Sequence, residues 1–169
     1  TVISRAESLV AFGVIALLAA LNGIRDNRRG LAAALVLMTA GTLLLALSTL
    51  LLEAGLISGF WWMTLVGLGS YLAYVPYGSV LFDRLIAATG AAGTAVFAIY
   101  VADAVGYTGS VGVLLYKDLA QSELSRLAFL EGFSWGLSAL GSVCLITSCV
   151  YFLRRTAPAA GAGAQHRRA

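Results

Sequence analysis

Charged side chains are scarce in this chain of 169 residues, where Asp, Glu, Lys and Arg together make up 11%. Ordinary soluble domains carry about 25% charged residues, so a water-exposed surface of the usual kind is excluded. Hydrophobic residues make up 60%, and the mean hydropathy is +0.89. Because hydrocarbon offers the backbone no hydrogen-bond partners, long apolar runs must be helical. We therefore predict an all-α fold, a polytopic transmembrane helix bundle.

The sequence is also poor in residues that bind metals or form disulfides. It has one histidine, His166, and two cysteines, Cys144 and Cys149, which lie five residues apart in one apolar run. The helical period places these thiols about 140° apart, so they cannot bridge each other, and we interpret them as small apolar residues. The sequence contains no P-loop, nucleophile elbow or dinucleotide-binding glycine motif. We expect no metal, no cofactor and no enzymatic activity.

Five apolar runs approach or exceed the length of about 20 residues that a helix needs to cross a hydrocarbon core. Pro76 lies inside the third run and predicts a kink there, because proline has no N–H to donate. After the last run the chain is small and basic with nothing to bury, which predicts a disordered tail over residues 156–169. The expected bundle covers residues 1–155, with spans at about 6–24, 31–52, 60–84, 91–116 and 124–153.

Lysine and arginine are distributed unevenly between the two ends of these runs. They stand singly or in pairs beside apolar segments, which is typical of topology signals and not of a nucleic-acid-binding face. Eight of these basic residues lie on one side and three on the other. By the positive-inside rule, the richer side, which includes the C-terminus, faces the cytoplasm, and the membrane is the cell (inner) membrane of a bacterium. The richer side holds Arg25, Arg28, Arg29, Arg84, Arg154, Arg155, Arg167 and Arg168, and the other holds Arg5, Lys117 and Arg126.

One carboxylate, Asp103, falls in the middle of the fourth apolar run. A charge at the bilayer centre costs on the order of 3 kcal/mol, so this side chain should face protein or a water-filled cavity. We interpret it as the charged member of a solute, cation or proton site, the alternative being a structural carboxylate hydrogen-bonded to a neighbouring helix. Helical spacing places Tyr100, Tyr107 and Ser110 on its face, and Ala98, Ala102, Gly109 and Gly112 toward the opposite side, which suits close helix packing.

The third run offers a second polar face, on which Tyr74 and Tyr77 lie. We include both tyrosines as candidates for the same substrate or proton site, the alternative being that they only pack or anchor at the membrane interface. Asp83 and Arg84, at the basic end of this run, are candidates for a gate or an interhelical ion pair. Flanking of the membrane interface is the alternative for these two residues.

The segment between the first two runs, LNGIRDNRRGL, contains Gly23, Asp26, Arg28 and Arg29. With a spacing one residue short, it resembles the Gly, Asp, Arg, Arg cytoplasmic-loop motif of the major facilitator superfamily. Five crossings, with this loop between the first two and a cytoplasmic tail, resemble helices eight to twelve of such a transporter. The stretches YVPYGSVLFDRLIAATG and IYVADAVGYTGSVGVLLYKDL also resemble an uncharacterised bacterial integral membrane family allied to that superfamily.

This resemblance implies alternating access of two helical bundles around a midplane site. The chain would be the C-terminal part of a secondary transporter for a small polar solute, with proton coupling through Asp103 as one form of the mechanism. Besides the lipid bilayer, its partners would be the missing N-terminal helices of the same protein or a partner subunit. The alternative function is a small membrane scaffold or assembly protein that does not transport.

Single cysteines in place of Ser122 and Ala164, in a background without Cys144 and Cys149, test this orientation. A membrane-impermeant thiol reagent added to whole cells should label position 122 and leave position 164 unlabelled, because the tail is expected to be cytoplasmic. Permeabilised cells, in which both positions should react, are the control. Labelling at position 164 but not at 122 would overturn the orientation.

Overall fold

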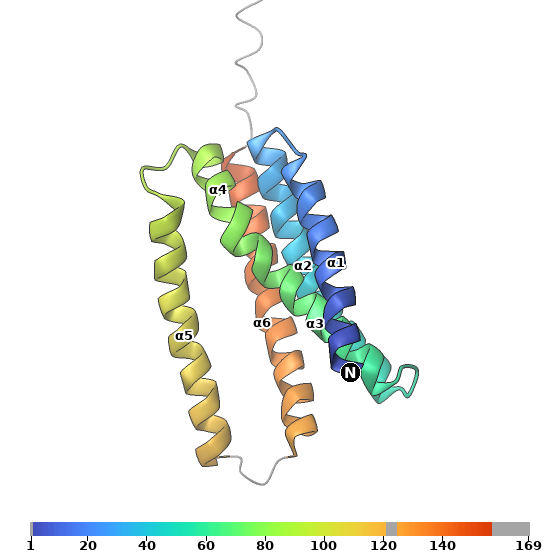
Figure 1. Cartoon of the computed structure of the whole chain (residues 1–169). Coiled ribbons are helices and arrows are strands. Elements are labelled where there is room, and N and C mark those ends of the chain that lie inside the picture. Colours follow the sequence, from blue (N-terminus) through green and yellow to red (C-terminus); the bar gives the residue numbers. More distant parts are fainter. Residues whose placement is uncertain (1, 121–124, 157–169) are drawn as a thin grey trace, which may run out of the picture.

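A computed structural model describes residues 2–120 and 125–156, and every regular element within these ranges is helical (Figure 1). This confirms the predicted all-α class. The elements are α1 (Val2–Asn22), α2 (Asn27–Glu53), α3 (Gly59–Pro76), the π-helical turn η1 (Tyr77–Leu81), α4 (Phe82–Thr89), α5 (Ala95–Ala120) and α6 (Arg126–Arg155). The predicted disordered tail lies outside the described residues, apart from Thr156.

Four described segments are long and apolar enough to cross a membrane, as expected of a helical membrane protein. α3, η1 and α4 follow one another without a break and together form one of these segments. The apolar part of α1, Glu7–Asn22, is shorter than the others. The fifth expected crossing therefore depends on a helix that is shorter than the other four. The four segments are Asn27–Glu53, Gly59–Thr89, Ala95–Leu119 and Leu127–Arg155.

Local capping explains where the helix bounds differ from those expected. α2 begins before residue 31 because Asp26 caps it, its Oδ1 accepting a 2.7 Å hydrogen bond from the Arg29 backbone N–H. α5 begins after residue 91 because Gly90 has a left-handed backbone with φ +65°, which ends α4. Thr94 then accepts a 3.2 Å hydrogen bond from the Phe97 N–H and opens α5. The connection between α1 and α2, residues 23–26, is therefore shorter than the expected 25–30. The connection between α4 and α5 lies at residues 90–94 instead of the expected 85–90.

The kink expected at Pro76 takes the form of a wide π turn. Pro76 ends α3, and η1 follows it directly over Tyr77–Leu81 before regular helix resumes in α4. The bend between α3 and α4 is visible in Figure 1. Such turns are uncommon and are often found at functional sites.

The centre of the bundle is a backbone contact between α2 and α3 at two glycines. A Cβ added to Gly41 would lie 2.6 Å from the Gly69 carbonyl oxygen and 2.8 Å from the Ala73 nitrogen. A Cβ on Gly69 would in turn lie 2.8 Å from the Gly41 carbonyl oxygen. No other residue fits at either position without separating the helices, and such small-residue crossings are a common way for helices to associate in membranes.

On an adjacent face α2 packs against α6 through small polar side chains. The hydroxyls of Thr42 and Ser142 lie 2.8 Å apart and are buried. Ser134 and Ser138, at helical spacing before Ser142, are buried as well. Gly141 allows this approach, because a Cβ there would lie 2.9 Å from Thr42 Cγ2. α2 therefore holds both α3 and α6, whereas α1 packs mainly on α3.

Gly41→Ala should destabilise the protein by about 1–3 kcal/mol, because the added methyl group meets backbone atoms that no rotamer change can move. Thermal unfolding in detergent, followed by circular dichroism, measures the effect. The matched control is Gly112→Ala, since a Cβ at Gly112 has no atom within 4 Å among those described. A midpoint for Gly41→Ala equal to that of the control would contradict the assigned backbone contact.

Candidate functional site

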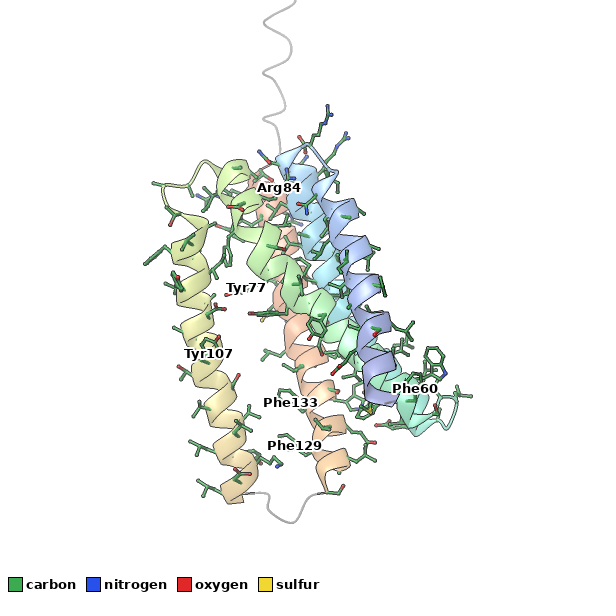
Figure 2. The ribbon with its side chains drawn as sticks, in the orientation of Figure 1. Phe60, Tyr77, Arg84, Tyr107, Phe129 and Phe133 are labelled. Atoms are coloured by element: carbon green, nitrogen blue, oxygen red, sulfur yellow. The ribbon has the colours of Figure 1, made fainter. Side chains whose placement is uncertain are left out.

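α5 stands at the edge of the bundle, apart from the other helices along much of its length (Figure 1). Its tyrosines are open, with Tyr100 69% and Tyr107 71% exposed. Near its far end the Lys117 ammonium lies 5.6 Å from the centre of the Phe129 ring of α6. Figure 2 shows Phe129 on the part of α6 that lies beside this end of α5.

In the N-terminal half of α5, and not at its middle as expected from the apolar run, the structure brings two predicted site residues together. The Tyr77 hydroxyl lies 3.2 Å from Oδ1 of Asp103 and 3.2 Å from the backbone carbonyl oxygen of Ile99. Tyr77 is the first residue of η1, so the wide turn sets the direction in which its ring leaves the helix (Figure 2). The contact links η1 to α5 through a single phenol.

This phenol has one proton and two possible acceptors. A carbonyl can only accept, whereas a carboxyl group accepts when ionised and can also donate when protonated. If Asp103 is ionised, the Tyr77 hydroxyl can donate its hydrogen bond to the carboxylate. If Asp103 is protonated, its own O–H can donate a hydrogen bond to the Tyr77 oxygen, while the Tyr77 hydroxyl donates to the Ile99 carbonyl. The same three groups can therefore form hydrogen bonds in both protonation states of Asp103.

An open groove of about 300 Å³ adjoins this contact. The Tyr74 ring stacks on Tyr77, with centroids 5.8 Å apart, and the Phe82 ring meets Tyr77 edge-on at 5.3 Å. These contacts hold the phenol from within its own helix segment. Residues from α2, α3, η1 and α5 line the groove, namely Met38, Ala73, Tyr74, Tyr77, Ala102, Asp103 and Gly106.

The other predicted polar residues of α5 do not reach this groove. Tyr100 and Tyr107 are largely exposed, and the Ser110 hydroxyl donates to the Gly106 carbonyl of its own helix at 3.0 Å. Ala102, expected on the opposite face, lines the groove beside Asp103. The side of α5 that meets η1 therefore lies between the two expected faces.

Close packing along the small-residue face of α5 is not found in the described part of the chain. A Cβ at Gly109 or Gly112 would meet no atom within 4 Å. Sequence reasoning also missed Met38, Ala73 and Gly106 as lining residues, and the Ile99 carbonyl as an acceptor. Ile99 lies one helical turn before Asp103, which is a signal that could have been used, whereas Met38 and Ala73 are ordinary apolar positions.

At the basic end of the bundle, Arg84 binds the loop between α1 and α2. Its Nη2 donates to the Ile24 carbonyl at 2.8 Å, and its Nη1 donates to Asn27 Oδ1 at 2.9 Å and to the Arg25 carbonyl at 3.5 Å. Gly30 leaves space for this side chain, because a Cβ there would lie 3.1 Å from Arg84 Nε. Arg84 was a gate candidate together with Asp83, and here it fastens the end of α1 to α4.

The predicted loop motif supplies further links at this end. Gly23 closes α1 through backbone hydrogen bonds from its N–H to the carbonyls of Ala19 and Ala20, and Asp26 caps α2. Arg28 Nη2 donates to the Leu153 carbonyl in the last turn of α6 at 3.2 Å. Among described residues the buried Nε of Arg28 has no hydrogen-bond partner. Arg29 contributes its backbone N–H to the Asp26 cap.

Residues 1–155 match a family described as "Family of unknown function (DUF5690)". No curated protein and no solved structure matches the chain. Within the described ranges, no group of three or more His, Cys, Asp or Glu side chains is placed to hold a metal ion.

Tyr77→Phe removes the hydroxyl that joins η1 to α5 and keeps the aromatic stack. Loss of about 1 kcal/mol of hydrogen bonding should speed amide hydrogen exchange around Ile99 and Asp103 roughly fivefold, while the midpoint of thermal unfolding changes little. Tyr74→Phe is the control, because the contact assigned to Tyr74 is made by its ring. Equal exchange in the two variants would show that the phenol does not hold α5.

Proposed function

We propose that this chain, which belongs to the family of unknown function DUF5690, is the C-terminal part of a secondary membrane transporter for a small polar solute, coupled to protons through Asp103. The observation that carries the proposal is the pairing of Asp103 with Tyr77 beside an open groove between helices. Carboxylates inside membrane-spanning helices are costly and commonly belong to ion or proton pathways. Grooves between helices of a bundle are frequent sites for small ligands.

Proton exchange at Asp103 provides a way to couple the groove to movement. When Asp103 is ionised, the Tyr77 hydroxyl donates to its carboxylate. When Asp103 is protonated, the Tyr77 hydroxyl can donate to the Ile99 carbonyl instead. The charge of the site and the direction of its hydrogen bonds change together at the contact between η1 and α5. Alternating access needs two arrangements of this kind, and Pro76 with the π turn supplies a break in the helix at which they can differ.

The open surface of α5 supports the proposal that further helices complete the site. Tyr100 and Tyr107 present polar groups to the outside, and polar groups in hydrocarbon need hydrogen-bond partners. We assign this cover to the missing N-terminal helices of the same protein or to a partner subunit. The resemblance to helices eight to twelve of a major facilitator transporter fits this arrangement, since its midplane site lies between two bundles.

The charge asymmetry of the sequence supports an inner-membrane location with a cytoplasmic C-terminus. In that orientation the Arg84 and Arg28 links lie at the cytoplasmic end of the bundle.

The alternative is a small membrane scaffold or assembly protein. The open side of α5 supports this alternative too, because it could bind the helix of another protein without any transport. The two functions differ in their dependence on Asp103. Proton-coupled transport needs its protonation, whereas a scaffold needs at most its hydrogen bond.

Asp103→Asn should abolish uptake driven by a pH gradient while leaving membrane insertion and thermal stability nearly unchanged, because Asn keeps the size and an acceptor for Tyr77 but cannot bind a proton. The measurement is uptake of radiolabelled amino acids, sugars and organic acids by cells expressing the full-length protein, with and without the gradient, normalised to folded protein. Asp118→Asn is the matched control on the same helix, since Asp118 is exposed and lies 3.8 Å from Lys117. Wild-type coupled uptake by Asp103→Asn would sink the coupling proposal.

A further inference from the structure

The last two turns of α6 carry a pair of arginines above two grooves. The first groove, of about 830 Å³, is shallow, wide open and lined by residues of α6 alone, and the second, of about 300 Å³, lies between α2 and α6. Ile146 and Val150 line both grooves and so form a ridge between them. The first groove is lined further by Thr147, Tyr151, Arg154 and Arg155, and the second by Val36, Thr39, Ala40, Leu43 and Cys149.

The basic end of the first groove has the donors that an anion requires. Arg155 Nη1 donates to the Tyr151 hydroxyl at 2.7 Å. Because a guanidinium can only donate, the Tyr151 hydroxyl accepts this hydrogen bond and still has its own proton to donate to another group. Arg154 and Arg155 are both exposed, and no acidic residue follows Glu131 in the sequence. Nothing on the second half of α6 therefore neutralises the two arginines.

A third guanidinium lies at the same end of α6. Arg28 donates to the Leu153 carbonyl, one residue before the arginine pair, and its buried Nε has no hydrogen-bond partner in the described part of the chain. The described acids near this end of the bundle are Asp26, which caps α2, and Asp83 in α4. Positive charge therefore dominates where α6 ends.

We propose that this surface binds one anionic phospholipid of the surrounding bilayer. The phosphate lies against Arg154, Arg155 and the Tyr151 hydroxyl, and the two acyl chains lie on either side of the ridge of Ile146 and Val150. The site is independent of the proposed transport function, because it shares no residue with the groove beside Asp103.

The shape and charge of the surface favour this ligand over related ones. The helix rises about 1.5 Å per residue, so Arg154 and Ile146 are separated by about 12 Å along α6, which matches the upper part of an acyl chain. A free phosphate would use the basic end and leave the apolar grooves empty. A zwitterionic lipid would bring its own cation toward the arginines, whereas an anionic headgroup gains attraction from each basic residue near the membrane surface.

Native mass spectrometry of the full chain tests the headgroup contact, with phosphatidylglycerol, phosphatidylcholine of the same acyl chains, and inorganic phosphate as probes. The double variant Arg154→Gln, Arg155→Gln should weaken phosphatidylglycerol binding by roughly ten- to thirty-fold. The double variant Arg25→Gln, Arg29→Gln removes the same charge at the same end of the bundle and should change it by less than about twofold. Equal losses in the two double variants, equal binding of phosphatidylcholine, or displacement of the lipid by phosphate at matched concentration would overturn the proposal.

A second pair of variants tests the acyl-chain grooves. Ala40 is exposed and lines the groove between α2 and α6, so Ala40→Phe should fill that groove and weaken phosphatidylglycerol binding about fivefold. Ala19→Phe, at an exposed position of α1 outside both grooves, should leave binding unchanged. Circular dichroism melts of each variant show that it is folded. Unchanged lipid binding by folded Ala40→Phe would contradict the placement of a chain between α2 and α6.

Discussion

The contact of Gly41 with Gly69 is the constraint on which the rest of this bundle depends. Helices in hydrocarbon gain little from burying apolar surface, so close backbone packing and hydrogen bonds must hold them together. With α3 pressed against one face of α2, the neighbouring face, about 100° around the helix, remains for α6, where Thr42 meets Ser142. The direction of α3 then determines where η1 arrives and places Tyr77 against α5.

The two ends of the bundle are held to different degrees. At one end Arg84 joins α4 to the end of α1 and the start of α2, and Arg28 joins α2 to the last turn of α6. Toward the other end α5 is connected to α6 by the Lys117 and Phe129 contact. A fold with one fastened end and one open helix can change its shape on the side of α5 while its core stays intact.

Sequence reasoning reached the class of the fold and named both Asp103 and Tyr77 as candidates, but it did not show that they meet or how the helices are rotated. Apolar runs reveal helices because hydrocarbon leaves the backbone no alternative, and Asp103 and Tyr77 stand out as polar groups in such runs. Which side of α5 meets η1 depends on packing between distant segments. Helical spacing alone therefore could not show whether the polar face or the small-residue face of α5 makes this contact. The earlier start of α2 was readable from the cap at Asp26, whereas the hold of Arg84 on the first loop needed the fold itself.

The π turn also determines which neighbouring elements Tyr77 and Arg84, at the two ends of this helix segment, can contact. Tyr77 and Arg84 are seven residues apart, and in a regular α-helix that spacing would put them on nearly the same face, toward one neighbour. The wide turn between them shifts the phase of the helix by an angle on the order of 100°, the value of one residue. Tyr77 can therefore meet α5 while Arg84 meets the loop after α1. A helix without this phase shift would have to give up one of the two contacts.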